Sequence, residues 1–355
     1  MESLDFYHEI CPDFSIDNLD IFKEPVSSVR KTDLNVQLAT KVLNIVLHFR
    51  RAAHSHSTCD HNCIPCQSPH LLKVITAIRN AKPITFVLPA FPGKSPNQSK
   101  VLGPLPDMAE QLALEFLQQL CDRIKEVYAP GAEIILCSDG RVFSDVVGMK
   151  ENDVTDYQHE LDRMISKLNL KNISTFNLDH LSNGKDFIQL RKELMESFGI
   201  PIEYLREKIL RGSRLVSHPE DKEAHRMYCG ITRFLVEDST FPGQVKTRSA
   251  IQKECKAKSY EVILRSNAWS ELINQRFPDA VRLSIHPQTC GAKKLGIRLV
   301  GTENWMTPWH GVAVKTNEEF ILLKRIEAEA LGAKLIISEN GRASHYEVLN
   351  ESQNF

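Results

Sequence analysis

Two kinds of hydrophobic pattern alternate along the first half of the chain. Three short apolar runs rich in β-branched residues, at 84–88, 133–137 and 172–176, are typical of buried strands. Helical spacing separates them, first over 106–128 and again over 155–168. The longer helix has an apolar face formed by Ala109, Leu112, Ala113, Phe116, Leu117, Leu120 and Ile124. Strands that alternate with helices build parallel sheets, so we predict an α/β fold with a mostly parallel sheet flanked by helices.

The rest of the chain changes pattern twice. Positions from about 185 to 277 predict a helical segment, and strand patterns return after Pro278. The short spacings among the first three of these later strands predict antiparallel hairpins that join or flank the sheet. The later strands are expected at 280–285, 295–300, 312–315 and 334–338. We therefore divide the chain into an N-terminal arm (1–33), a main domain (34–323) with a helical insertion at about 185–277, and a C-terminal extension (324–355) packing on the sheet.

Composition excludes several classes of protein. The 355 residues carry a net charge of −1, which gives no indication of a nucleic-acid or membrane-surface partner. The N-terminus lacks the pattern of a signal peptide, and no apolar run is long enough to span a membrane. The nine cysteines are odd in number and lie mostly in apolar or helical runs. We therefore expect a reducing, cytoplasmic compartment.

The first candidate site follows the strand at 84–88. Its loop contains Gly93-Lys94-Ser95, which resembles part of a nucleotide-binding P-loop, but that motif needs a glycine where Leu88 stands. Prolines in the loop also remove N–H groups that would bind phosphate. We therefore expect a ligand-binding loop of another kind, with Lys94 as a catalytic cation and Phe91 and Asn97 as substrate contacts.

The second candidate site is Ser138-Asp139-Gly140-Arg141, followed by Asp145. It comes directly after a predicted strand, and the carboxyl ends of parallel strands meet at one edge of a sheet. Asp139 could exchange protons or bind an amine, and Arg141 could hold a carboxylate or phosphate through two hydrogen bonds. The alternative is an aspartate that caps a helix, followed by a surface arginine.

The third candidate site spans the later strands. Ser284 and His286 lie near the end of one strand, and Lys294 and Arg298 flank the next. The stretch 305–310 then combines two tryptophans with a histidine, which suits the wall of a site for an aromatic or apolar substrate near a proton carrier. This third group of candidates includes Trp305, Thr307, Trp309 and His310. A buried loop that closes the sheet is the alternative.

A cysteine cluster stands apart from these three segments. Cys59, Cys63 and Cys66 have a C-x3-C-x2-C spacing, with several histidines nearby. Three thiolates closed by His61 would suit a tetrahedral structural zinc. The same spacing occurs in enzymes that hold an iron–sulfur cluster, although Pro65 stands where those enzymes usually have an aromatic residue. A reduced surface loop without metal is the third possibility.

The segments, taken in order, resemble the isocyanide (isonitrile) synthase family. That family includes bacterial synthases of tyrosine and tryptophan isonitriles and the fungal spore-wall dityrosine proteins. The resemblance rests on four motifs and spans about residues 38–320. The motifs are Leu88-Pro89-Ala90-Phe91-Pro92-Gly93-Lys94-Ser95-Pro96-Asn97, Ser138-Asp139-Gly140-Arg141-Val142-Phe143-Ser144-Asp145, Arg282-Leu283-Ser284-Ile285-His286-Pro287 and Thr307-Pro308-Trp309-His310-Gly311-Val312-Ala313-Val314.

The resemblance implies a Rossmann-like fold and conversion of an L-amino acid into its isonitrile, with the extra carbon taken from ribulose 5-phosphate. On that reading Asp139, His286 and His310 would move protons, Lys94 and Arg141 would bind phosphate, and other cations would bind the carboxylate. No cofactor is implied for catalysis. An iron/2-oxoglutarate oxygenase would be a separate protein. Another phosphosugar-dependent lyase or transferase, or a non-catalytic zinc-stabilised binding protein, remains an alternative.

Overall fold

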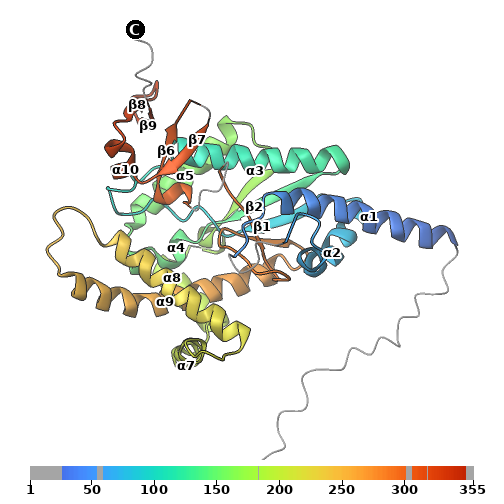
Figure 1. The fold of residues 1–355 in the computed structure, drawn as a ribbon, viewed down its shortest axis with the longest axis horizontal. Coiled ribbons are helices and arrows are strands. Elements are labelled where there is room, and N and C mark those ends of the chain that lie inside the picture. The colour runs from blue at the N-terminus through green and yellow to red at the C-terminus, as the bar shows by residue number, and fades with distance from the viewer. Residues whose placement is uncertain (1–25, 54–58, 183, 301–305, 318, 349–355) are drawn as a thin grey trace, which may run out of the picture.

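A five-stranded parallel sheet forms the centre of the protein (Figure 1). The computed structural model describes residues 26–53, 59–182, 184–300, 306–317 and 319–348. The strands of this sheet are β1 (Ile84–Leu88), β2 (Ala132–Cys137), β3 (Ile173–Phe176), β4 (Val281–Ser284) and β5 (Leu295–Gly296). All neighbouring pairs are parallel, in the order β3-β2-β1-β4-β5. The predicted α/β fold with a mostly parallel sheet is confirmed.

The strand order reverses between β1 and β4. The chain moves outward from β1 through β2 to β3, and then returns to the other side of β1 to form β4 and β5. In open α/β sheets a crevice opens outside the carboxyl ends of the strands at such a reversal, and ligands bind there. The topology therefore indicates a ligand site where β1 and β4 end.

Helices cover both faces of this sheet. Those of the first half are α1 (Val26–His48), α2 (Ile64–Arg79), α3 (Met108–Val127), α4 (Gly140–Val147) and α5 (Glu151–Lys167). The buried apolar face of α3 includes Leu114, Leu117 and Leu120, and Asp107 and Glu110 form a capping box at its start. Because α1 begins at Val26, the end of the predicted N-terminal arm is helical, while residues 1–25 lie outside the described part of the chain.

The predicted helical segment forms a second helical layer. It comprises α6 (Phe187–Phe198), α7 (Ile202–Gly212), α8 (Pro219–Asp238) and α9 (Arg248–Arg276). The longest of these, α9, contacts α4, α6, α7 and α8 and reaches the main sheet, where Trp269 stacks on Phe176 with ring centroids 5.6 Å apart. Among the helices that the structure describes, none is both long and apolar enough to cross a membrane.

The C-terminal strands form a separate four-stranded sheet that lies against α3 (Figure 1). Its strands are β6 (Val312–Lys315), β7 (Phe320–Leu323), β8 (Lys334–Ile337) and β9 (Ala343–Glu347), and α10 (Arg325–Ala330) lies between β7 and β8. The predicted C-terminal extension thus completes this second sheet instead of packing on the main one. The β6–β7 and β8–β9 pairs are antiparallel, as expected for C-terminal antiparallel strands, whereas the β6–β9 pair is parallel, so this sheet is mixed.

The prediction of antiparallel hairpins among the first three late strands was wrong. β4 and β5 are parallel members of the main sheet although only ten residues separate them. The parallel arrangement is possible because the segment that follows α1 lies between the two sides of the loop that joins β4 to β5. Arg50 pairs with Ile297 and Ala52 pairs with Gln288, so the loop is hydrogen-bonded along both of its sides.

Candidate active site

The three sequence segments expected to carry chemistry meet at one edge of the main sheet. The loop from Pro89 follows β1, Asp139 follows β2 and His286 follows β4, and these strands are neighbours. The first two loops are in direct contact, since a Cβ atom at Gly140 would lie only 1.8 Å from the carbonyl oxygen of Pro92. Gly140 is therefore required by this close approach of two backbones.

Asp139 is the carboxylate at this edge. Its side chain does not cap α4, which excludes the alternative role considered from the sequence. Desolvation by burial raises the pKa of Asp139 to about 7, and the nearby charge of Arg282 opposes that rise only in part. The residue nevertheless keeps some accessibility to solvent. A carboxyl group that is desolvated, accessible and half-protonated near neutrality suits proton transfer.

Arg282 is a functional candidate that the sequence analysis missed. It lies in β4 and is only 7 % exposed. Its Nη2 donates to Ser270 Oγ at 3.2 Å, whereas its buried Nε and Nη1 have no hydrogen-bond partner. Burial lowers its pKa, and the nearby Asp139 raises it again only partly. The sequence signal was an arginine within the strand expected at 280–285, and the structure shows that every position of β4 is buried. Unpaired buried donors are costly, so they indicate a position where an anion binds.

Two histidines complete the proton-carrying groups. Desolvation lowers the pKa of His286 to about 4, although its side chain is exposed to solvent. Desolvation also holds the pKa of His310 well below its usual value, with Lys100, Lys94 and His286 contributing repulsion. The Nδ1 atom of His310 lies 2.7 Å from Thr307 Oγ1, which fixes the ring. Both imidazoles are therefore neutral at neutral pH, and their lowered pKa values make them weak bases.

Lys294 brings a second cation to the same place. It is exposed, yet the surrounding protein lowers its pKa by desolvation, and the charge of Arg282 lowers it further. Five of these groups are electrostatically linked, because the pKa of each is shifted by the charge of at least one of the others. We call them the switch-point cluster: Asp139, Arg282, His286, Lys294 and His310. Ser284 supports the cluster because its Oγ accepts a hydrogen bond from the His286 backbone N–H at 3.1 Å.

Lys94 has a different environment from the one expected. Its ammonium lies 2.9 Å from Asp107 and 2.7 Å from Glu110, and it donates to the Pro308 carbonyl at 3.1 Å. An ammonium has three donors, and these internal partners use all of them. The group is fully buried, and its carboxylate partners raise its pKa against the effect of desolvation. This arrangement argues against the predicted catalytic role and indicates that Lys94 ties the loop to the start of α3.

Arg141 is also bound internally. It is 2 % exposed, forms ion pairs with Glu151 at 2.9 Å and Asp179 at 3.3 Å, and donates to Thr155. Its guanidinium also lies over the ring of Phe187, 4.0 Å from the centroid. It is neither the predicted anion-binding group nor a surface arginine, because it joins α4 to α5.

Asp145 and Asn97 also have protein partners. Asp145, in α4, forms an ion pair with Arg265 at 2.7 Å. The side-chain amide of Asn97 donates to the carbonyls of Glu237 and Thr240, both at 3.0 Å. The first residue therefore joins α4 to α9, and the second joins the β1 loop to the end of α8. Neither of these contacts leaves the side chain directed at a substrate.

Two other predicted substrate contacts, Phe91 and Trp309, are buried and pack against each other next to the carboxyl edge of the main sheet. Phe91 is fully buried with φ = 58°, an unusual conformation for a residue with a side chain, and its ring lies 5.2 Å from that of Trp309. Its carbonyl accepts hydrogen bonds from Ser138 and Gln158. The described part of the 305–310 loop is thus packed into the core through Trp309, in agreement with the alternative of a buried loop that closes the sheet. Within the described part of this loop, Thr307 contacts His310 through its hydroxyl group, and the ring of Trp309 lies edge-on to the His310 ring with centroids 6.0 Å apart.

The two remaining predicted contacts are Arg298 and Trp305. Arg298 donates to the carbonyl of His48 at 3.3 Å, at the end of α1. Trp305 lies outside the described residues. A separate cavity of about 180 Å³ beside the β1 loop is lined by Gly93, Ser95 and Lys150 among others, and by no member of the switch-point cluster. It is smaller than usual small-molecule sites.

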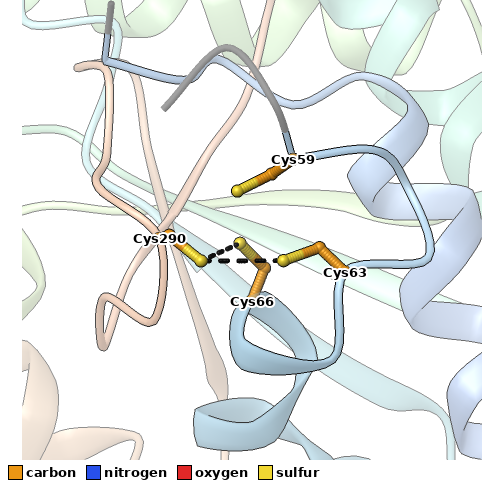
Figure 2. A group of neighbouring side chains, drawn as sticks. All are labelled: Cys59, Cys63, Cys66 and Cys290. Carbon is orange, nitrogen blue, oxygen red and sulfur yellow. Dashed lines mark hydrogen bonds between the residues drawn. The ribbon is translucent and has the colours of Figure 1, made fainter. Parts of the chain in front are cut away.

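The cysteine cluster has a fourth member that differs from the predicted one. The Sγ atoms of Cys59, Cys63, Cys66 and Cys290 all lie within 4.8 Å of one another (Figure 2). His61 is exposed and its Nε2 contacts the side chain of Asn62 at 3.3 Å, so it does not complete the set. The spacing within 59–66 could not reveal a partner that lies 224 residues beyond Cys66.

Comparison with known proteins places the whole described core in one group of relatives. The family profile described as pyoverdine/dityrosine biosynthesis protein matches residues 74–336. An L-tryptophan isonitrile synthase of Fischerella ambigua is 42 % identical over 317 residues, which are 88 % of this chain and 96 % of the relative. An L-tyrosine isonitrile synthase of Pseudomonas aeruginosa is 41 % identical, over 87 % of this chain and 94 % of the relative. The crystal structure of PvcA from Pseudomonas aeruginosa aligns with a TM-score of 0.81 and 41 % identity, covering 88 % of this chain and all of PvcA.

Proposed function

This chain belongs to the isocyanide synthase family, and we propose that it converts the amine of an aromatic L-amino acid into an isonitrile. We further propose that ribulose 5-phosphate donates the extra carbon, in secondary-metabolite biosynthesis. The relatives named above act, by their names, on L-tryptophan and L-tyrosine. The switch-point cluster is the proposed catalytic site.

The observation that carries this proposal is a buried Arg282 with two unpartnered donors, close enough to Asp139 for each charge to shift the pKa of the other group. A buried guanidinium with two unsatisfied donors provides a site for a phosphate or carboxylate. The carboxyl group beside it titrates near neutral pH. The amino acid and the phosphosugar each bring an anion, so two cations are needed. Arg282 supplies one and Lys294 the other.

The remaining groups suit the proton transfers of this reaction. The substrate amine must lose a proton before it can attack the C2 ketone, the carbonyl oxygen must gain one, and water must then leave. Neutral His286 and His310 can accept protons, and Asp139 with a pKa of about 7 can both donate and accept. Fragmentation of the sugar skeleton follows the condensation. This scheme needs no redox cofactor, and any later oxidation would belong to a separate iron/2-oxoglutarate oxygenase.

Direct assay tests the proposal. Purified protein is incubated without added cofactor with ribulose 5-phosphate and tyrosine, tryptophan or valine, and isonitriles are trapped with a tetrazine and identified by mass spectrometry. We expect a trapped product with tyrosine or tryptophan. Loss of ribulose 5-phosphate without a trapped product would replace the proposal with another phosphosugar-dependent lyase or transferase.

Variants test the assignment of the site. Asp139→Asn and His310→Ala should each lower turnover by about 10² or more if both groups transfer protons. Arg163→Met changes an exposed residue away from the cluster and serves as the control. Full turnover in both cluster variants would contradict the placement of the active site.

A further inference from the structure

The four clustered cysteines form a site that the proposed reaction does not use. We propose that Cys59, Cys63, Cys66 and Cys290 bind one structural Zn²⁺. The Sγ atoms of Cys63 and Cys66 lie 3.6 and 3.5 Å from Sγ of Cys290. Tetrahedral zinc with Zn–S bonds of about 2.3 Å requires sulfur atoms about 3.8 Å apart. The observed cluster therefore has the size of a single tetrahedral ion.

The side chains converge on one point from separate parts of the chain (Figure 2). Cys59 comes from the segment before α2, Cys63 is the N-cap of α2 and Cys66 lies in its first turn. Cys290 comes from the loop between β4 and β5. Gly291, with φ = 76°, forms the turn beside it. Four thiolates leave no open coordination position, which is the arrangement of structural and not catalytic zinc.

The surroundings compensate the charge that zinc binding would create. Four thiols would release four protons, and a Zn²⁺ ion with four thiolates carries a net charge of −2. The Nη1 atom of Arg50 donates to Cys66 Sγ at 3.0 Å, and its Nη2 donates to the Cys59 carbonyl at 3.3 Å. The N-terminus of α2 also points at the cluster through Cys63. A guanidinium and a helix N-terminus both stabilise thiolates.

The proposed ion would hold the loop that carries two members of the switch-point cluster. His286 and Lys294 stand on either side of Cys290 in the β4–β5 loop. His70 of α2 contacts the backbone of Ala292, so the loop is already attached to α2 beside the cysteines. Zinc at this position would fix that loop to α2. The inference does not depend on which reaction the protein catalyses.

Metal analysis of intact protein, purified under reducing conditions without chelator, tests the site. We expect about one zinc per chain and little iron. Cys290→Ser should lose most of the zinc, whereas His61→Ala and Cys229→Ser should keep it, because His61 and Cys229 lie outside the cluster. Cobalt taken up in place of zinc should show the absorption of tetrahedral cobalt thiolate.

A second measurement on the unmodified protein covers the case in which Cys290→Ser does not fold. Adding a zinc-specific chelator to the native protein should increase by four the number of cysteines that a thiol reagent modifies. Three results would overturn the proposal: iron with acid-labile sulfide in place of zinc, a disulfide among the four cysteines in freshly purified reduced protein, or neither bound zinc nor cobalt uptake. Zinc lost from His61→Ala but kept in Cys290→Ser would restore the ligand set expected from the sequence.

Discussion

Two groups of buried charges lie at the same edge of the sheet and differ in how they are satisfied. Lys94 and Arg141, from the two motifs that stand out in the sequence, are surrounded by carboxylates and carbonyls of the protein itself. Arg282, one strand away, has two buried donors without a partner. Desolvation raises the pKa of Asp139, whose charge interacts with that of Arg282, to about 7.

On the proposed assignment of the site, this difference separates charges that hold elements together from charges that bind substrate. A buried ion pair with all donors satisfied holds elements together, and its loss leaves the partner charge buried alone. A buried cation with unpartnered donors costs free energy in the empty protein and recovers it when an anion binds. The comparison therefore predicts opposite effects on stability and on substrate binding for the two groups. The free energy of unfolding should fall most when the buried charge that is removed has the most ionic partners.

Lys94→Met should have the largest effect on stability. It leaves Asp107 and Glu110 buried beside each other, at a cost of about 3 to 5 kcal/mol in the free energy of unfolding. The loss should grow as the pH rises, because burial already raises the pKa of Glu110 to about 7 and protonation relieves the repulsion. Urea unfolding at several pH values measures it. The exposed Lys171 provides the control, since Lys171→Met should change stability by less than about 0.5 kcal/mol.

Arg141→Met should have a smaller effect, of about 1 to 3 kcal/mol. Glu151 and Asp179 are partly exposed, so water can hydrate them when the guanidinium is removed. Turnover per folded molecule should stay within a factor of about three if Arg141 does not contact substrate. A KM for ribulose 5-phosphate raised far beyond that factor would show that Arg141 binds the phosphate after all.

Asp139→Asn should change how stability depends on pH. The pKa of Asp139 is about 7 in the folded protein and near 3.8 in the unfolded chain, so the folded state holds more protons between these values. This carboxyl group therefore makes the protein less stable as the pH rises from about 4 to 7, by about 1 to 3 kcal/mol after allowance for its partial exposure. Asp139→Asn should lack this pH-dependent contribution to the free energy of unfolding.

The histidines act in the opposite direction over part of that range. The lowered pKa values of His286 and His310 mean that the unfolded chain binds more protons, so their contribution to stability rises with pH up to about 6.5. Both proteins contain these histidines, so the histidine contribution cancels in the difference in unfolding free energy between Asp139→Asn and the unmodified protein. That difference therefore reports the contribution of Asp139 alone. A difference that does not change with pH would show that its carboxyl group titrates normally.

The hydrophobic pattern of the sequence predicted most helices and strands, but it did not predict for every strand whether it pairs in parallel or antiparallel. The apolar runs that form β1, β2 and β3 and the helices between them were identified because alternation and helical spacing are local properties. The direction of β5 was missed because it depends on the segment around Arg50 and Ala52, which lies far away in the sequence. Hydrophobic pattern does not encode such a contact.

The site was predicted only in part for a similar reason. Motif spacing singled out Asp139, His286, His310 and Lys294, which are members of the switch-point cluster that we propose as the catalytic site. It could not separate Lys94 from a ligand-binding lysine, because its partners come from the start of α3 and from Pro308. Nor could it find Cys290, which completes its cluster only after the fold forms.

The most direct test of the central claim is Arg282→Met, studied by urea unfolding and by calorimetric titration with ribulose 5-phosphate. Removing a buried cation whose Nε and Nη1 donors lack partners should leave stability within about 1 kcal/mol of the unmodified protein or raise it. The same change should weaken binding of the phosphosugar by a factor of about 10 or more. A variant that loses several kcal/mol of stability, as expected for Lys94→Met, but binds ribulose 5-phosphate normally would contradict the account.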